Sequence, residues 1–318
     1  MLSMHQHLQK NDQQRIAIRQ AAKRFAQSSA SKSVEVYIPP MHLQPEHDQL
    51  RTIVPWHYNG FIVKLPGYTL AVDPGVNFAY RLQLGGFDIT SIDGIFVSHD
   101  HIDHVHDAAV LIEILHRIGK GTVIYTTHKT IDDGKISRYH AGLEKPDGLT
   151  RTTFIEDSQQ VELPNGMTME FVALHHGTPC YGLRILMADK LVVGYISDTG
   201  YSKELLPLAQ EFVDPKKALD NFPDTNAECQ TVISGASLAI CNIDGYWHNK
   251  NSLTHMAAID AAHLLGVVRP DRALLTHLNP MGELPDANQW CQDIATEVAQ
   301  LSGISVQAAG PDGITIQV

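Results

Sequence analysis

Residues 98–107, SHDHIDHVHD, gather several side chains that bind metal ions within one short segment. His99 and His101 are two residues apart, so in an extended segment both side chains leave on the same side. Asp103 continues this alternation, and His104 follows it directly. Imidazole and carboxylate ligands without a nearby cysteine thiolate suit Zn²⁺, Mn²⁺ or Fe²⁺. An accidental polar loop with surface histidines is the alternative, but the position of the string between an apolar strand and a helix favours a metal site.

Three further ligand-type residues each stand at the end of an apolar run: Asp73 in LAVDPG, Asp198 in GYISDTG and His277 in ALLTHLNP. Together with the histidine string, these motifs resemble the metallo-β-lactamase superfamily. They occur in the family's order over roughly residues 59–280. The resemblance implies that Asp198 bridges two metal ions and that His277 is the last ligand. A lone aspartate at a strand end would otherwise be a poor ligand candidate.

The segment EFVALHHGTP offers two histidines, His175 and His176, for a further ligand position. Within the superfamily, the closer resemblance is to the ribonuclease Z-like branch of phosphodiesterases, which includes cyclic-nucleotide phosphodiesterases. In that branch the ligand lies in a His-Gly-x-Pro-x-x-Gly segment followed by an arginine-containing strand. HGTPCYGLRI matches with His176. The resemblance therefore implies His176 as the ligand and His175 as a neighbouring or packing residue.

The same branch carries an additional histidine at the start of the helix before the last ligand strand, and His255 has that place here. A locally packed helix-start histidine is the alternative, and lactonases and β-lactamases would not require this residue. Two features depart from the tRNA-processing members. The chain lacks their glycine- and proline-rich arm, and the strand LAICNID lacks the glutamate that supports the extra histidine. Asp244 is a candidate for that support.

The predicted centre holds two divalent metal ions, expected to be Zn²⁺ with Mn²⁺ or Fe²⁺ as alternatives. The predicted ligands are His99, His101, Asp103, His104, His176, Asp198 and His277. The resemblance also implies three catalytic roles. His255 would protonate the leaving alkoxide, Asp103 would steer the nucleophile, and Asp73 would orient the ligands.

The predicted function is a dinuclear metal-dependent phosphodiesterase that hydrolyses a small cyclic nucleotide, with a metal-bridging hydroxide attacking phosphorus. The alternatives are a tRNA 3′-processing endonuclease and a lactone or thioester hydrolase of the same fold. A binding or sensor protein with a degenerate fold is disfavoured by the complete ligand set. The formal net charge is −11 and no basic run occurs, so a long nucleic acid is disfavoured as a substrate.

Around these residues, short apolar runs alternate with helical patterns. Strands are predicted in GFIVKL, TLAVD, GIFVSH and TVIYTT, with a helix in DAAVLIEILHRIG that Asp107 can cap and Gly119 can end. ISVQAAGPDGITIQV at the end of the chain is predicted to form a hairpin. Strand clusters at both ends, with helices between, favour an α/β fold. The pattern suggests two sheets between layers of helices, and the resemblance implies the metallo-β-lactamase αββα sandwich, with two mixed sheets flanked by helices.

Residues 1–50 are predicted to form a helical arm and an extended connector, and residues 51–318 the catalytic domain, with an insertion at about 211–232. No apolar stretch is long enough for a membrane span, and the start of the chain lacks the apolar core of a signal peptide. The four cysteines are far apart and are expected to be reduced and mostly buried. A cytoplasmic protein with a small phosphodiester substrate is expected, without membrane association. The sequence leaves the oligomeric state open, and the resemblance implies a homodimer as one option.

Overall fold

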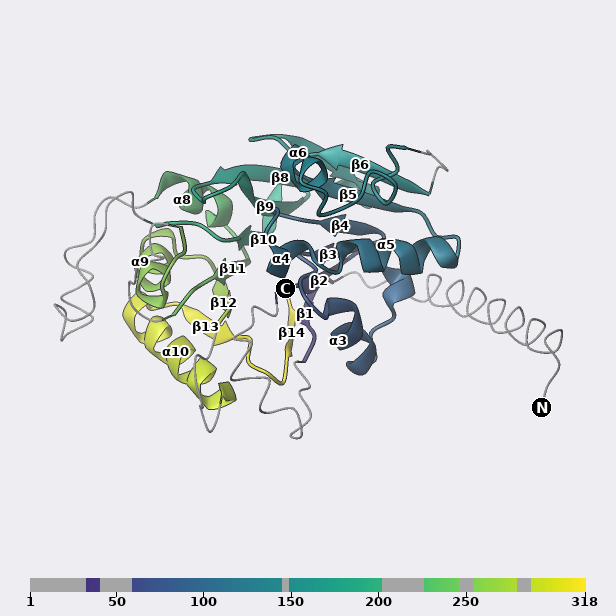
Figure 1. The fold of residues 1–318 in the computed structure, drawn as a ribbon. Coiled ribbons are helices and arrows are strands. Elements are labelled where there is room, and N and C mark those ends of the chain that lie inside the picture. The colour runs from purple at the N-terminus through teal and green to yellow at the C-terminus, as the bar shows by residue number, and fades with distance from the viewer. Residues whose placement is uncertain (1–32, 41–58, 145–148, 202–225, 246–253, 279–286) are drawn as a thin grey trace, which may run out of the picture.

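The computed structural model describes residues 33–40, 59–144, 149–201, 226–245, 254–278 and 287–318. Their strands form two seven-stranded sheets that face each other (Figure 1). In sheet order, the first consists of β14 (Ile314–Gln317), β1 (Glu35–Ile38), β2 (Phe61–Leu65), β3 (Tyr68–Val72), β4 (Gly94–Phe96), β5 (Thr122–Thr126) and β6 (Thr150–Phe154). The second consists of β13 (Ser305–Ala308), β12 (Arg272–Thr276), β11 (Leu238–Asn242), β10 (Lys190–Ile196), β9 (Cys180–Met187), β8 (Met167–Leu174) and β7 (Gln160–Leu163).

Helices cover the outer face of each sheet, as Figure 1 shows. On the first sheet lie α3 (Phe78–Leu84), η2 (Ile89–Ser91), α4 (Ile102–Val105), α5 (Ala108–Arg117) and α6 (His128–Asp132). On the second sheet lie α8 (Ala227–Ile233), α9 (Ala258–Val268) and α10 (Ala287–Ser302), and the short turn η3 (Pro164–Gly166) precedes β8. Both sheets mix parallel and antiparallel pairs. The predicted αββα sandwich is therefore confirmed.

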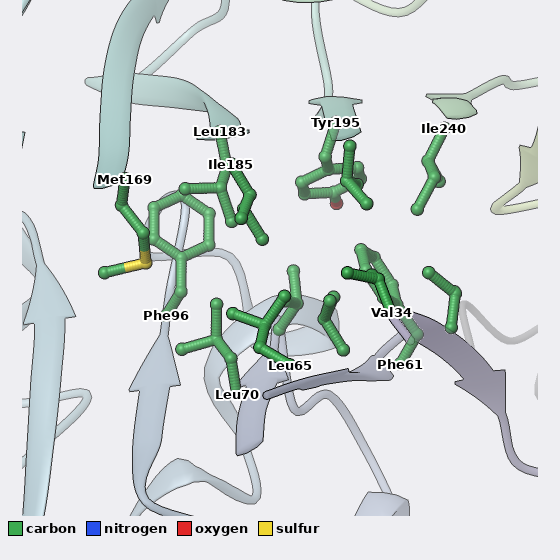
Figure 2. Close-up of a cluster of buried hydrophobic side chains, with 14 of the residues drawn as sticks. Val34, Phe61, Leu65, Leu70, Phe96, Met169, Leu183, Ile185, Tyr195 and Ile240 are labelled. Atoms are coloured by element: carbon green, nitrogen blue, oxygen red, sulfur yellow. The ribbon is translucent and has the colours of Figure 1, made fainter. Parts of the chain in front are cut away.

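The core between the sheets consists of apolar side chains that alternate along the strands and point to the facing sheet. In Figure 2, Phe61, Leu70 and Phe96 from the first sheet meet Met169 and Tyr195 from the second. This layer holds the two sheets together and so fixes the positions of their strand ends.

Several predicted elements are confirmed. GFIVKL and TLAVD form the hairpin of β2 and β3, in which Phe61 pairs with Val72. The predicted helix after the histidine string is α5, and Gly119 follows its last turn with a φ of 73°. Asp107 holds the N-cap position, but its side chain does not cap α5. Its Oδ2 instead accepts a hydrogen bond from the amide of Ala79 at 2.9 Å, which anchors α3.

The predicted hairpin at the end of the chain is wrong. β13 pairs in parallel with β12 in the second sheet, whereas β14 pairs antiparallel with β1 in the first. The Gly-Pro-Asp-Gly turn between them therefore carries the chain from one sheet to the other. Both strands bury apolar residues, Ala308 in one and Ile316 in the other. Each of these two strands forms its hydrogen bonds with a neighbour in its own sheet. The local turn chemistry therefore did not decide the pairing.

Two described elements lie inside the predicted N-terminal arm and the predicted insertion. Residues 35–38, inside the predicted arm and connector, form β1 between β14 and β2, where Val36 is fully buried. Residues 227–233, at the end of the predicted insertion, form α8, whose Cys229 and Val232 pack against the second sheet. Residues 1–32, 41–50 and 211–225 of these segments lie outside the described residues. No helix in the described part of the chain is both long and apolar enough to cross a membrane.

Candidate metal centre

The predicted site residues follow the strands at one end of the sandwich. Asp73 follows β3, the histidine string follows β4, Asp198 follows β10 and His277 follows β12. Each of these strands has a parallel neighbour, and the carboxyl ends of parallel strands meet at one edge. Asp73 and His277 have positive φ values of 45° and 62°. Side chains other than glycine rarely adopt this conformation, and such strain is concentrated at functional sites.

Gly75 lets two parts of the site approach closely. A Cβ atom at this position would lie 1.8 Å from the backbone oxygen of Asp103. No side chain other than hydrogen fits that space. The glycine in LAVDPG therefore allows the turn after β3 to pack directly against the helix start that carries Asp103.

Two groups of ligand-type side chains meet at this edge, and in each group the ligand atoms all lie within 4.8 Å of one another. The first group, here called the first cluster, is His99, His101, His176 and Asp198. The second cluster is Asp103, His104, Asp198 and His277. The structure thus brings together all seven predicted ligands, and Asp198 belongs to both clusters.

His99 provides a test of whether the first cluster fits a metal ion. The residue is fully buried, and its Nε2 has no hydrogen-bond partner within the described part of the chain. Its Nδ1 lies 2.9 Å from the hydroxyl of Ser98. Burial and the nearby His104 lower the pKa of His99 well below its usual value. A buried, neutral imidazole with one anchored nitrogen and one open nitrogen is the form in which histidine binds a metal ion.

His176 completes the first cluster. Its Nε2 lies 3.2 Å from Nδ1 of His101, and its Nδ1 donates to the carbonyl of Thr254 at 2.8 Å. Burial lowers the pKa of His176, which favours the neutral ring. His175 is exposed and outside both clusters, and its backbone contacts Thr199. The geometry therefore agrees with the choice of His176 over His175.

The second cluster combines oppositely charged groups. His104 Nε2 lies 3.2 Å from Asp198 Oδ2, and His277 Nε2 lies 3.2 Å from Asp103 Oδ2. Burial alone would raise the pKa of Asp198, but His277 and His104 outweigh it and hold this pKa well below the usual range. Burial also opposes the charged form of Asp103, and His104 and His277 again keep its pKa low. The carboxylates are therefore ionised and suited to divalent cations.

Asp73 lies beneath the clusters and contacts a residue of the second cluster and the residue before His99 of the first. Its Oδ2 is 2.9 Å from Nδ1 of His104, which leaves Nε2 of that ring directed at Asp198. Its Oδ1 accepts from the amide of Ser98 at 2.7 Å, and Ser98 in turn contacts His99. One buried carboxylate thus supports a histidine in each cluster.

Tyr195 and Asn242 were not predicted from the sequence, yet they connect Asp73 to Asp198. The Tyr195 hydroxyl donates to Asp73 Oδ2 at 2.7 Å, and Asn242 Nδ2 donates both to Tyr195 at 3.0 Å and to Asp198 Oδ1 at 3.1 Å. Asn242 is a polar residue at the end of the apolar run LAIC, which was an available signal. In the sequence, Tyr195 has the features of an ordinary core residue of a strand.

Asn59 is a third unpredicted neighbour of the centre. It is buried, and its Nδ2 lies 2.7 Å from Nε2 of His104. Arg81 holds its backbone carbonyl at 3.2 Å. Asn59 precedes β2 and follows residues outside the described part, so the sequence offered no motif that would have indicated it.

His255 lies beside the clusters without belonging to either group. Its Nε2 is 3.3 Å from Asp198 Oδ2, and its side chain is 22% exposed. Its ring centre lies 5.1 Å from that of His176 at an angle of 89°. Two backbone hydrogen bonds hold the segment after it, from Asp244 to Met256 at 2.8 Å and from Ala258 to Gly245 at 3.0 Å. Asp244 therefore supports this segment through its backbone.

The family comparison agrees with this geometry. The model of the β-lactamase superfamily domain matches residues 68–278. The chain therefore belongs to this family, and its fold and His/Asp site define it as a hydrolase of the metallo-β-lactamase fold with a metal site. Residues 68–278 contain every predicted ligand and His255.

Among curated proteins, two relatives stand out. The chain is 24% identical over 188 residues to cAMP/cGMP-dependent 3′,5′-cAMP/cGMP phosphodiesterase B of Dictyostelium discoideum, covering 58% of this chain and 16% of that protein. It is 28% identical over 138 residues to the anti-Pycsar protein Apyc1 of Paenibacillus xerothermodurans, covering 40% of this chain and 55% of that protein. The matched region is thus about half or less of each relative.

Solved structures support the fold at low sequence identity. The metallo-β-lactamase fold protein YhfI from Bacillus subtilis superimposes with a TM-score of 0.65 at 18% identity, covering 91% of this chain and all of that one. Zn²⁺-bound PqqB from Methylobacterium extorquens gives 0.60 at 11% identity, over 90% and 100% of the two chains. The short form of human tRNase Z gives 0.57 at 14% identity, over 89% and 98%.

Proposed function

We propose that the chain binds two divalent metal ions, one in each cluster, and hydrolyses a small cyclic nucleotide as a phosphodiesterase. His99, His101 and His176 would hold one ion, Asp103, His104 and His277 would hold the other, and Asp198 would contact both. Zn²⁺ fits these ligand types, and Mn²⁺ and Fe²⁺ are alternatives. When bound, two such ions supply an activated water and offset the negative charge of a phosphate.

The position of His255 is the observation that supports phosphodiester hydrolysis. Its imidazole lies 3.3 Å from the carboxylate common to both clusters and is partly open to solvent. It is therefore within reach of a substrate at the centre. An alkoxide leaves easily only if it is protonated, whereas hydrolysis of a lactone or a β-lactam at a metal centre does not require such an acid.

Asp103 has a second role in this proposal. Its carboxylate is bound to His277 at 3.2 Å and lies 3.6 Å from Nε2 of His104. Because the pKa of Asp103 stays low, the group is an acceptor and can orient the attacking water by a hydrogen bond. Asp73 would act indirectly, because it contacts His104 and orients that ring.

The substrate class rests on charge and on the relatives. A net charge of −11 gives little attraction for a long polyanion, while one or two phosphate charges can be matched by the metal ions alone. One relative is named as a cyclic-nucleotide phosphodiesterase and the other as an anti-Pycsar protein. A cyclic nucleotide is also small enough to need no separate arm for binding.

The experiment compares two substrates in His255→Ala. Turnover of 3′,5′-cyclic nucleotides should fall by about 10²- to 10⁴-fold, since the ribose alkoxide needs an acid. Turnover of bis-p-nitrophenyl phosphate should fall much less, because p-nitrophenolate leaves without protonation. His175→Ala is the matched control, since this histidine is exposed and outside both clusters. Zinc content is measured for all three proteins, and His255→Ala should keep its metal.

Equal losses on both substrates would make His255 a binding residue. If His255→Ala loses turnover of neither substrate, His255 is not a general acid, and hydrolysis of a lactone or thioester becomes the favoured reaction. Pre-tRNA and acyl-homoserine lactone are assayed beside the cyclic nucleotides with Zn²⁺ and Mn²⁺. Preferred cleavage of pre-tRNA or of the lactone would contradict the proposed substrate class while leaving the metal centre intact.

A further inference from the structure

Asp100 stands between two predicted ligands but points to neither cluster. Side chains alternate along an extended segment, so Asp100 leaves on the side opposite His99 and His101. Its Oδ1 accepts a hydrogen bond from the Thr178 hydroxyl at 2.6 Å, and its Oδ2 lies 3.6 Å from Nζ of Lys129. Asp100 is 7% exposed. A buried carboxylate is costly unless hydrogen bonds and a cation compensate it, and here both do.

This hydrogen bond connects the two segments that build the first cluster. Asp100 belongs to the segment with His99 and His101, and Thr178 lies two residues after His176. The bond spans 78 residues of chain. Close to it, His101 Nδ1 and His176 Nε2 are held 3.2 Å apart, a separation that sets the bite of the cluster.

The second cluster has other supports. Asp73 holds His104 at 2.9 Å, and Asn242 holds Asp198 at 3.1 Å. Asp103 and His277 contact each other directly. None of these contacts involves the segment that carries Thr178.

We propose that the Asp100–Thr178 hydrogen bond positions the first cluster selectively, so that its loss weakens metal binding there and not in the second cluster. Both are positioning residues that act through His99, His101 and His176. The inference rests on the metal centre of the proposed function and not on its substrate. Contacts that orient metal ligands from outside are commonly worth about 10- to 100-fold in metal affinity.

The test uses Thr178→Val, which keeps the shape of the side chain and removes its hydroxyl. Zn²⁺ binding to the full chain is followed by chelator competition, together with zinc content by mass spectrometry. His176→Ala, which lacks a ligand of the first cluster alone, identifies one binding step. Asp103→Ala identifies the other. Thr178→Val should weaken the first-cluster step by about 10-fold or more and shift the other by less than about 3-fold.

Two further variants complete the design. Thr178→Ser retains the hydroxyl and should restore most of the affinity lost in Thr178→Val. Asp133→Asn is the matched control, because Asp133 also pairs with Lys129 but contacts neither ligand segment. Thermal unfolding of each metal-free variant shows whether the fold is kept.

An unchanged first-cluster step, or an equal loss at both steps, would overturn the positioning role. If the unsubstituted protein binds no zinc, the metal centre itself is contradicted, and the positioning role with it. The two failures are distinct, because the second is visible before any variant is made.

Discussion

His176 donates a hydrogen bond from Nδ1 to the backbone carbonyl of Thr254 at 2.8 Å, across 78 residues of the chain. The next residue is His255, whose ring stands at 89° to that of His176. A predicted ligand and the proposed acid are therefore placed by the same contact. A metal ion at His176 would also fix the tautomer that makes this hydrogen bond, and so would stabilise the position of His255.

Asp198→Ala should remove most of the bound metal from both clusters. Asp198 is the one residue common to the two groups, and it contacts His104 at 3.2 Å as well as His255 at 3.3 Å. Purified natural protein is expected to carry close to two transition-metal ions per chain, measured by mass spectrometry. Near-full metal content in Asp198→Ala would contradict its shared role, and the surface variant Asp133→Asn serves as the control.

Gly75→Ala should be far more damaging than Gly177→Ala. The added Cβ at position 75 would fall 1.8 Å from the Asp103 oxygen, whereas no atom lies within 4 Å of a Cβ at position 177. Forcing an atom into a packed site typically costs about 1–3 kcal/mol. We therefore expect Gly75→Ala to lower the free energy of unfolding by at least this amount and to lose zinc from the second cluster. Denaturant unfolding and zinc content measure both effects, and similar values for the two variants would be evidence against the close approach.

The sequence could predict which ligand-type side chains lie together at one end of the sandwich. His99, Asp198 and His277 follow apolar runs that form strands with parallel neighbours, and the ends of such strands meet at one edge of a sheet. His176 follows β8, whose neighbours are antiparallel, so its place was indicated by the motif and not by this rule. The choice between His175 and His176 came from a motif, and the structure places His176 in the first cluster and His175 outside it.

Features that depend on distant partners could not be predicted. The turn between β13 and β14 has hairpin chemistry, but the two strands find their partners in different sheets. The connection between Asp73 and Asp198 runs through Tyr195, a residue whose type is typical of a strand core. Asp100 looked like part of the histidine string, and only its contact with Thr178 gives it a separate role.

The four cysteines should be unreactive in the folded protein. Cys180, Cys229, Cys241 and Cys291 are all free and buried. Burial raises the pKa of Cys241 to about 12 and that of Cys291 to about 11, so almost no thiolate exists near neutral pH. Ellman's reagent at about pH 8 should label close to four thiols per chain in guanidinium and well under one in buffer within minutes. Rapid labelling of the folded protein would show an accessible thiol and contradict this burial.

The second cluster should make the stability of the metal-free protein depend on pH in the opposite way to that of the zinc-loaded protein. Burial lowers the pKa of His104, but Asp198, Asp103 and Asp73 outweigh burial and hold this pKa well above the usual 6.5. Burial also opposes the charged form of His277, and Asp198 and Asp103 raise its pKa in the same way. The raised pKa values favour the protonated rings when no metal is bound, and their positive charges offset part of the charge of the carboxylates.

A histidine with a raised folded pKa adds stability that is complete below its unfolded pKa of about 6.5 and is lost as the pH rises through the folded value. His99 and His176 have lowered pKa values, so they stay neutral above this point and do not oppose the trend. The Tm of EDTA-treated protein should therefore fall between about pH 6.5 and 9. Zinc binds only neutral imidazoles, so the same rise in pH removes competing protons and strengthens binding. The Tm of the zinc-loaded protein should hold or rise over this range, as measured by thermal unfolding in matched buffers, and parallel slopes with and without zinc would contradict the assignment of His104 and His277 as ligands.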